Sequence, residues 1–263
     1  GDDALDKDVA LCSAYGAKMV TGREIASVQE LKDEGFSDII VAIGAWAHGR
    51  KALKYGEEYD ALEFLEKVKA APGSIDLGTD VVVIGGGNTA MDVARAAKIQ
   101  PGVEHVRLVY RRDRRNMPAD EEELVMAIED GVEFMELLAP EGVENGVLKC
   151  EKNVLGEPDA SGRRSPVGTG EFCEVPATAV ICAVGERIKT GLYEAAGAEI
   201  DSKGKPVVDE NLMTTVPGLY AAGDCRRGPA TVVKAIADAQ TIATAIIGAD
   251  FSKYADLDAK GDM

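Results

Sequence analysis

The chain has 263 residues, 46% of them hydrophobic, which is enough to bury a sizeable core in one large domain or two smaller ones. Its formal net charge of -17 argues against nucleic acid or an anionic membrane surface as the main partner, because a polyanion would be repelled. No apolar run approaches the length that spans a bilayer, and the start, Gly1-Asp2-Asp3, has neither an initiator methionine nor the layout of a signal peptide. We therefore expect a processed or truncated chain that no membrane holds.

The five cysteines are widely spaced and form no C-x-x-C pair, which is typical of reduced thiols in a cytoplasmic protein. An iron–sulfur cluster, a zinc ribbon or a thioredoxin-type disulfide is therefore not expected. The two histidines, His48 and His105, lack the spacing of metal ligands and are expected to be structural or solvated. The sequence thus predicts neither a metal site nor a Ser-His-Asp triad. The cysteines are Cys12, Cys150, Cys173, Cys182 and Cys225.

Hydrophobic periodicity near the start of the chain predicts alternating helices and strands. In chain order, a helix, an edge strand, a helix, a strand and an amphipathic helix are expected over 4–15, Lys18–Thr21, Ser27–Glu34, Asp38–Gly44 and Ala61–Ala70. Ser27 is the expected N-cap of the second helix, with Glu30 three positions later. Pro72-Gly73-Ser74 ends the last of these helices.

A β-branched strand over Val81–Ile84 then breaks at glycine and leads directly into a helix. Gly85, Gly87 and Ala90 match the G-x-G-x-x-A form of the dinucleotide-binding turn. In such a turn the first glycine allows the tight bend, the second lets a pyrophosphate approach bare backbone, and the small third residue lets the helix pack against the strand. The helix N-terminus offers N–H groups and the positive end of its dipole to the phosphates. The alternative is a purely structural glycine turn.

The end of the next strand, Val103–Tyr110, indicates which dinucleotide is bound. It falls about 20 residues past the glycines, where an acidic residue grips the adenosine ribose in NAD-binding proteins of this kind. Here Arg111 and Arg112 take that place, and guanidinium groups favour NADP because they bind a 2′-phosphate bidentately. The alternative is a solvated basic loop that pairs with the acidic run 120–123. Further arginines extend the cluster: Arg107, Arg114 and Arg115.

The second half of the chain continues this alternation but contains one region of different character. A helix, a strand, an antiparallel meander, a strand, a strand and a long helix are expected over 120–130, 132–135, 140–176, 179–184, 218–222 and 230–247. Glycines separate the short apolar stretches of the meander, which is expected to cover the parallel sheet. The segments 38–44 and 178–185 share a strand-then-glycine form and bracket the dinucleotide unit, which suggests paired crossovers into a neighbouring domain.

A second cofactor signal lies in Gly218-Leu219-Tyr220-Ala221-Ala222-Gly223-Asp224, which combines a short strand, a close-approach glycine and an exposed carboxylate. A carboxylate at a strand end can accept hydrogen bonds from the ribitol hydroxyls of a flavin. The N-terminus of the helix that starts near Thr231 can face the electron-rich end of the flavin ring. A simple turn followed by a core helix explains these residues equally well.

Three motifs carry a family resemblance over nearly the whole chain. They are Gly85–Asp92, Val109–Arg112 with Met117-Pro118-Ala119, and Gly218–Asp224. In combination they resemble the small (beta) subunit family of NADPH-dependent glutamate synthase. That family includes related FAD- and NAD(P)-dependent pyridine nucleotide-disulfide oxidoreductases, among them selenate reductase-type subunits.

The resemblance implies an α/β fold of two Rossmann-like dinucleotide-binding domains, with three layers and parallel sheets. An NAD(P)-binding domain, residues 76–188 with the antiparallel meander, would be inserted into a partial FAD-binding domain made of residues 1–75 and 189–263. By this likeness Asp224 would hold the flavin ribitol, the helix start at 231–240 would face the isoalloxazine, and the arginine pair would hold the 2′-phosphate of NADP. The expected cofactor-binding residues are Gly85, Gly86, Gly87, Asn88, Thr89, Ala90, Arg111, Arg112, Gly185, Gly223, Asp224 and Thr231.

Members of that family carry an earlier G-x-G-x-x-G turn for the FAD pyrophosphate and upstream cysteines for iron–sulfur clusters, and neither precedes Gly85 here. The chain is therefore expected to be part of a NADPH-dependent flavin oxidoreductase that passes a hydride from NADPH to FAD and works with other domains or subunits of an electron-transfer complex. Alone it is expected to be inactive, to bind FAD weakly or not at all, and to expose an apolar edge near 38–44 that favours self-association. The alternative is a NADP-binding module or interaction subunit with no activity of its own.

Overall fold

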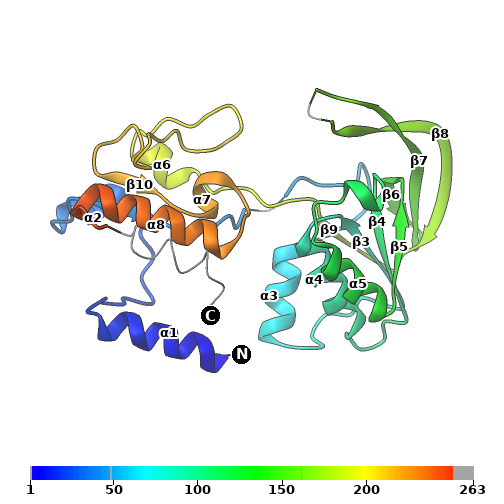
Figure 1. Cartoon of the computed structure of the whole chain (residues 1–263). Coiled ribbons are helices and arrows are strands. Elements are labelled where there is room, and N and C mark those ends of the chain that lie inside the picture. Colours follow the sequence, from blue (N-terminus) through cyan, green and yellow to red (C-terminus); the bar gives the residue numbers. More distant parts are fainter. Residues whose placement is uncertain (1, 48, 161, 251–263) are drawn as a thin grey trace, which may run out of the picture. The chain divides into compact units, whose positions relative to one another are not determined.

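The computed structural model describes residues 2–47, 49–160 and 162–250, which form two compact units (Figure 1). In its described part, unit 1 consists of residues 2–41, 190–221 and 238–250, and unit 2 consists of residues 42–189 and 222–237. Each unit is therefore built from segments that are distant in the sequence. The predicted boundaries at residues 75 and 188 concern cofactor-binding domains and stay a prediction.

Unit 1 contains a two-stranded parallel sheet and several helices. Strand β1 (Ile39–Val41) pairs with β10 (Leu219–Ala221), and Ile39 lies opposite Leu219. The Ser27 hydroxyl accepts a hydrogen bond from the Glu30 amide at 3.2 Å, which confirms the predicted N-cap. The helices are α1 (Asp2–Ala14), α2 (Val28–Asp33), α6 (Gly191–Ala195) and the later part of α8 (Val232–Ile247).

The predicted edge strand over Lys18–Thr21 is wrong. These residues have no regular secondary structure, and Met19 and Val20 are exposed. A strand forms only where a neighbouring backbone can pair with its N–H and C=O groups. None of the described strands lies beside this segment, so β-branched and apolar residues alone do not make a strand here.

Unit 2 is organised around a five-stranded parallel sheet in the order β2-β9-β3-β4-β5. Val81, Val82 and Val83 in the centre of β3 are fully buried, because a parallel strand that is covered on both faces needs a continuous apolar run. The strands are β2 (Tyr59–Asp60), β3 (Asp80–Gly85), β4 (His105–Tyr110), β5 (Val132–Glu136) and β9 (Ala179–Ala183).

Three helices in unit 2 contribute to one buried cluster with the parallel sheet. Residues of each helix pack in a core with Val81, Val83 and Leu108 of the sheet. Asp60 caps the first of them, since its carboxylate accepts hydrogen bonds from the Leu62 and Glu63 amides. The helices are α3 (Ala61–Ala70), α4 (Asn88–Lys98) and α5 (Glu121–Glu129), and the short turn η1 (Arg114–Asn116) precedes α5.

The opposite face of the parallel sheet packs against the predicted antiparallel meander, which forms a three-stranded sheet in the order β6-β7-β8. Val82, Ile84 and Val109 of the parallel sheet share a buried cluster with Leu148 and Val175 of the meander. The strands are β6 (Leu138–Glu144), β7 (Val147–Pro158) and β8 (Arg164–Pro176). Unit 2 therefore has three layers, and the predicted α/β class with a parallel sheet is confirmed.

A helical turn that sequence analysis did not predict follows β10. It is α7 (Asp224–Arg227), which stands where a simple turn was expected, before the predicted long helix α8.

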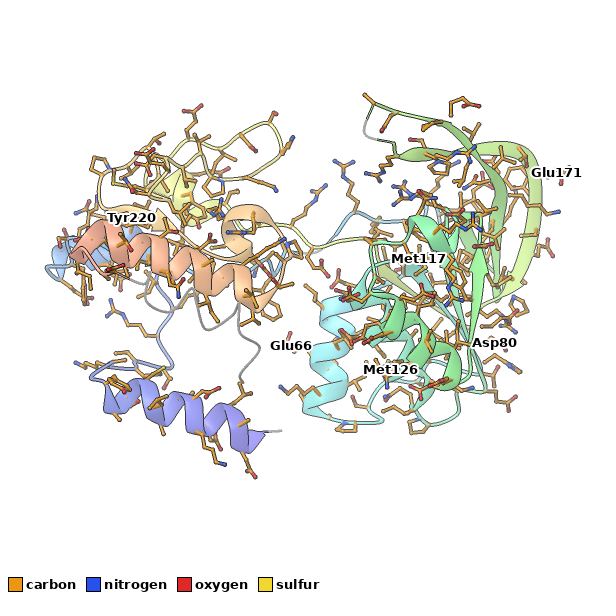
Figure 2. All side chains as sticks on the ribbon, in the orientation of Figure 1. Glu66, Asp80, Met117, Met126, Glu171 and Tyr220 are labelled. Carbon is orange, nitrogen blue, oxygen red and sulfur yellow. The ribbon has the colours of Figure 1, made fainter. Side chains whose placement is uncertain are left out.

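Asp80 begins β3 and Met117 follows the far end of β4, so these two residues mark opposite ends of the parallel sheet (Figure 2). Among the described helices, none combines the length and apolar character that crossing a membrane requires.

Candidate functional site

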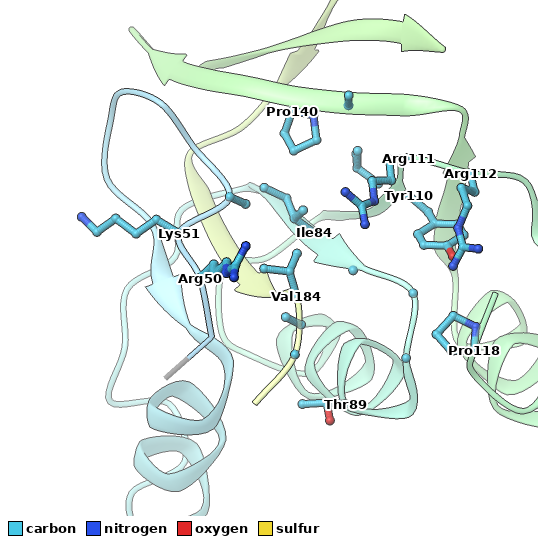
Figure 3. A pocket seen from close by; sticks show the side chains of 18 of the residues that line it. Arg50, Lys51, Ile84, Thr89, Tyr110, Arg111, Arg112, Pro118, Pro140 and Val184 are labelled. Atoms are coloured by element: carbon cyan, nitrogen blue, oxygen red, sulfur yellow. The ribbon is translucent and has the colours of Figure 1, made fainter. Parts of the chain in front are cut away.

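A cavity of about 660 Å³ lies in unit 2 at the carboxyl ends of β3, β4 and β9 (Figure 3). Open α/β sheets bind ligands at this edge, because the loops there carry glycines and helix N-termini. Five cations and one carboxylate line the cavity, in a chain whose net charge is -17. The lining comprises residues 50–52, 84–87, 109–112, 139–140 and 183–186, with Thr89, Pro118 and Arg163.

The glycine turn has the geometry that the sequence predicts. Gly85 has φ +157°, and a Cβ there would overlap the Ala183 carbonyl and come within 3.0 Å of the Ala90 Cβ. A side chain at Gly86 would overlap the ring of Tyr110. At Gly87, by contrast, an added Cβ meets nothing within 4 Å, so the backbone faces open space. Gly87 is also the N-cap of α4 and no side chain caps this helix, which leaves its first turn available to an anion.

The side chains of Asn88 and Thr89 hold the turn in place. Asn88 and Asp120 form a reciprocal pair: Asn88 Nδ2 donates to the Asp120 carboxylate at 2.9 Å, and the Asp120 amide donates to Asn88 Oδ1 at 2.9 Å. This pair joins the start of α4 to the N-cap of α5. Thr89 Oγ1 donates to Glu186 at 2.6 Å, and Glu186 is the carboxylate of the cavity lining. Both side chains therefore bond to other residues of the protein and fix the start of α4.

Arg111 and Arg112 lie at the cavity end of β4, as predicted. Figure 3 shows the Arg111 side chain turned toward the cavity and Arg112 beside Tyr110. The Arg112 guanidinium carbon lies 5.6 Å from the centroid of the Tyr110 ring, within the range of a cation–π contact. Arg112 Nε is buried and has no hydrogen-bond partner among the described residues. A buried guanidinium N–H without an acceptor fits a site that an anionic ligand completes.

The wider arginine cluster does not converge on the cavity. Arg107 donates to Asp80 at 2.8 Å and to Glu133 at 3.2 Å, so it joins neighbouring strands of the sheet. Arg114 pairs with Glu121. Arg114 and Arg115 line a separate hollow with Phe134 and Glu136. The expected extension of the cluster is therefore wrong, and the alternative of pairing with the acidic run holds for Arg114.

Three cations of the lining were missed by sequence analysis: Arg50, Lys51 and Arg163. Arg50 and Lys51 lie on a loop that runs close to the end of β9, since a Cβ on Gly49 would overlap the Gly185 carbonyl. The Cys182 thiol donates to the Arg50 carbonyl at 3.4 Å. Figure 3 shows the Arg50 side chain beside Val184 and facing the cavity, while Lys51 points away. No motif marks these residues, because the fold alone brings them to the site.

The remaining predicted cofactor residues divide into two groups. Gly185, with φ +100°, lines the cavity. Gly223, Asp224 and Thr231 are not among its lining residues. Asp224 begins α7 and its carboxylate accepts a hydrogen bond from the Ala230 amide at 3.1 Å, while the Thr231 carbonyl accepts from Lys234 at the start of α8. A flavin role for these three residues stays a prediction.

Burial governs the chemistry of two thiols in the described part of the chain. None of the five cysteines forms a disulfide in the described part of the chain, and burial raises the pKa of the Cys150 thiol to about 12 and that of Cys182 to about 11, so both stay protonated at neutral pH. His105 is exposed at the start of β4, and His48 lies outside the described residues. Within residues 2–47, 49–160 and 162–250, no group of three or more His, Cys, Asp or Glu side chains could hold a metal ion.

Comparisons with known proteins identify relatives of this chain. The chain is 36% identical over 249 residues to YgfK of Escherichia coli K12, which its name describes as an oxidoreductase, and the match covers 93% of this chain but 24% of YgfK. It is 41% identical over 182 residues to the glutamate synthase [NADPH] small chain of the same organism, covering 65% and 38%. It is 33% identical over 290 residues to the NADPH-Fe(3+) oxidoreductase subunit beta of Geobacter sulfurreducens, covering 92% and 41%. The chain thus spans about a quarter to two fifths of the length of these relatives.

Solved structures show the same fold. Mycobacterium tuberculosis FprA in complex with NADPH superposes with a TM-score of 0.69 at 21% identity, over 89% of this chain and 70% of that one. The thioredoxin reductase of T. acidophilum superposes with a TM-score of 0.55 at 22% identity, over 78% and 62%. The family model of the pyridine nucleotide-disulphide oxidoreductases matches residues 4–239. This chain therefore belongs to the pyridine nucleotide-disulphide oxidoreductase family.

Proposed function

We propose that the cavity binds NADPH and that the chain is the NADPH-binding part of a flavin oxidoreductase. The observation that carries this proposal is that an open backbone at Gly87 lines the same cavity as Arg111 and Arg112. The buried Nε of Arg112 lacks a hydrogen-bond partner among the described residues. The names of two relatives and of one similar structure include NADPH, which supports the choice of dinucleotide.

The charges of the cavity match those of this ligand. NADPH carries a pyrophosphate and a 2′-phosphate, and the lining has one carboxylate and, besides Lys51, which points away, four arginines. The pyrophosphate would lie at Gly87 and the uncapped first turn of α4, where N–H groups and the helix dipole favour an anion. The 2′-phosphate would lie at the arginine pair, because guanidinium groups bind phosphate oxygens bidentately.

When bound, NADPH supplies a hydride from its nicotinamide C4, with FAD as the proposed acceptor at N5. Glu186 is held by Thr89 at 2.6 Å, so its carboxylate is fixed beside the start of α4. The reaction requires no proton donor or acceptor from the protein, and we assign no acid or base. The chain's task is to bind and orient the dinucleotide.

The flavin side of the site is also a proposal. Gly223, Asp224 and Thr231 would contact the flavin, with the Asp224 carboxylate accepting from ribitol hydroxyls and the start of α8 facing the ring. The Asp224 carboxylate already accepts a bond from the Ala230 amide, which fixes it between α7 and α8. The residues present fit part of a flavin site, and other domains or subunits of an electron-transfer complex would supply the rest.

Calorimetric titration with NADPH and NADH tests the proposal. Hydrogen bonds between charged groups contribute roughly 1.5–3 kcal/mol each, so Arg111→Ala and Arg112→Ala are expected to weaken NADPH binding by about 10- to 150-fold and to spare NADH. Arg115→Ala is the matched control, since Arg115 lies in the same loop but lines the separate hollow. Equal losses for the two dinucleotides would remove the case for NADPH.

A further inference from the structure

The hairpin of β7 and β8 extends beyond the rest of its sheet. Strand β6 has 7 residues, whereas β7 and β8 have 12 and 13. The pairing of β6 with β7 ends at Lys152, so residues 153–160 and 162–168 form the two sides of a hairpin arm. Arg163 lies at the tip of the arm and lines the same cavity as the glycine turn and the arginine pair.

The base of the hairpin arm is fixed to the arginine pair through Asn153. This residue is 7% exposed, and its side-chain Nδ2 donates to the Arg111 carbonyl at 3.0 Å. Its amide donates to the Leu137 carbonyl at 2.7 Å, and the Leu137 amide donates in turn to the Arg112 carbonyl at 3.0 Å. The backbone of both arginines is therefore held by the meander, and the arm starts at the residue that holds them.

The two neighbouring arginines at the tip of the hairpin arm, Arg163 and Arg164, make different contacts. Arg164 crosses the hairpin, because its Nε donates to the Gly156 carbonyl at 2.8 Å and its Nη2 to the Leu155 carbonyl at 3.1 Å. The Arg163 amide donates to the Asp159 carboxylate at 3.0 Å, which fixes its backbone. The Arg163 guanidinium is exposed and makes no hydrogen bond to a described residue, so it is available to a ligand in the cavity.

We propose that Arg163 binds the 2′-phosphate of NADPH together with Arg111, which lines the same cavity, and that the hairpin arm is therefore a specificity element. The inference rests on the proposed NADPH site. We assign Arg163 to the 2′-phosphate because Asn153 joins the arm to the end of β4. In dinucleotide-binding folds, residues at this strand end contact the 2′ position of the adenosine ribose. The phosphate would then contact guanidinium groups that follow β4 of one sheet and precede β8 of the other.

Titration of the purified chain with NADPH, NADH and adenosine 2′,5′-bisphosphate tests this assignment. Arg163→Ala is expected to weaken the binding of NADPH and of the bisphosphate by about 5- to 20-fold and to leave NADH unchanged, because only the first two carry the 2′-phosphate. Arg163→Lys keeps the charge without the bidentate geometry and is expected to fall between. Lys152→Ala is the matched control, since it removes a cation from β7 that pairs with Glu171 instead of lining the cavity.

Each outcome separates this inference from the proposed function. Unchanged NADPH binding by Arg163→Ala would overturn the inference, and so would an equal loss for NADPH and NADH, which would place the arginine at the shared pyrophosphate. An unmodified chain that binds neither NADPH nor the bisphosphate would overturn the proposed function itself. Circular dichroism of each variant checks that the fold is intact, which is expected because the Arg163 side chain holds no other described residue.

Discussion

At the scale of single residues, the three glycines of the dinucleotide turn have different physical reasons to be glycine. Gly85 needs a backbone conformation that side chains rarely adopt, and Gly86 leaves room for the Tyr110 ring. Gly87 has an extended backbone, with φ −99° and ψ 174°, and open space around it. No atom of the described chain therefore requires a glycine at this position. Such an open backbone is expected where a ligand approaches.

Substitutions at these neighbouring glycines are expected to separate stability from binding. Gly87→Ala should leave the free energy of unfolding within about 0.5 kcal/mol of the unmodified chain, because no atom lies in the way. It should weaken NADPH and NADH equally, since both carry the pyrophosphate. Gly86→Ala should lower the free energy of unfolding by about 1–3 kcal/mol through overlap with Tyr110. Urea denaturation and calorimetry measure both effects, and a large loss of stability in Gly87→Ala would contradict the account.

At the scale of secondary-structure elements, the side chain of Arg107 joins the start of β3 to β4, β5 and β8. It donates to Asp80, to Glu133 and to the Pro176 carbonyl at 3.3 Å. The side chains of Arg107 and Asp80 are 14% and 21% exposed, whereas that of Glu133 is 61% exposed. The Asp80 contact is therefore the one expected to contribute measurably to stability.

This ion pair predicts how stability depends on pH. Hydrogen bonds from Arg107 and from the Thr79 hydroxyl lower the pKa of Asp80 in the folded chain. Because the pKa of Asp80 is lower in the folded chain, its contribution to the free energy of unfolding is complete above the pKa of an unfolded Asp, about 4. This contribution is lost as the pH falls through the pKa of the folded chain. Asp80→Asn should reduce the free energy of unfolding at neutral pH by about 1–2 kcal/mol and flatten its decline in acid. Urea denaturation across the acidic range checks this, with Glu133→Gln as the control expected to change little.

Sequence reasoning predicted elements well wherever local pattern and tertiary packing agree. The continuous apolar run of β3, the cap at Ser27 and the glycine-separated strands of the meander all leave a local signal. The segment 18–21 also has a local signal but lacks a partner strand among those described, so it stays irregular. A strand depends on its neighbours, and a single sequence does not show them.

The candidate site was predictable to a smaller extent, for a related reason. The glycine turn and the arginine pair belong to one contiguous βαβ unit with fixed spacing, which the sequence shows directly. Arg50 and Arg163 come from a loop and a hairpin tip that contribute no motif. Arg107 looked like part of the cluster, but its position within β4 turns it to carboxylates of neighbouring strands.

At the scale of the whole molecule, we predict that the purified chain is colourless. FAD affinity depends strongly on a glycine turn that cradles its pyrophosphate, and the turn at Gly85–Gly87 is assigned here to NADPH. The contacts around Asp224 and Thr231 are not expected to hold the flavin alone, so NADPH-dependent turnover should be negligible. Absorbance in the visible range after gel filtration measures this. A stoichiometric flavin spectrum would show that the expectation is wrong.

The two-stranded sheet of unit 1 predicts self-association of the purified chain. Two strands alone are marginally stable in water, and Ile40 and Ile43 in and after β1 are 48% and 41% exposed. Sedimentation velocity is expected to show association that increases with protein concentration. Ile40→Lys should reduce it, because a charge at this position opposes burial against another copy. A chain that stays monomeric at all concentrations would argue against this edge as a contact surface.

The interleaved order of the segments has a consequence for biosynthesis. Residues 42–189 carry all five strands of the parallel sheet and the whole meander, so this part of unit 2 can fold while the ribosome is still adding later residues. Strand β1 must instead wait for β10, about 180 residues later, before its hydrogen bonds can form. The nucleotide cavity is thus expected to be complete on the nascent chain before unit 1 exists. The first segment of unit 1, residues 2–41 in the described part of the chain, would meanwhile be exposed to chaperones and to neighbouring nascent chains.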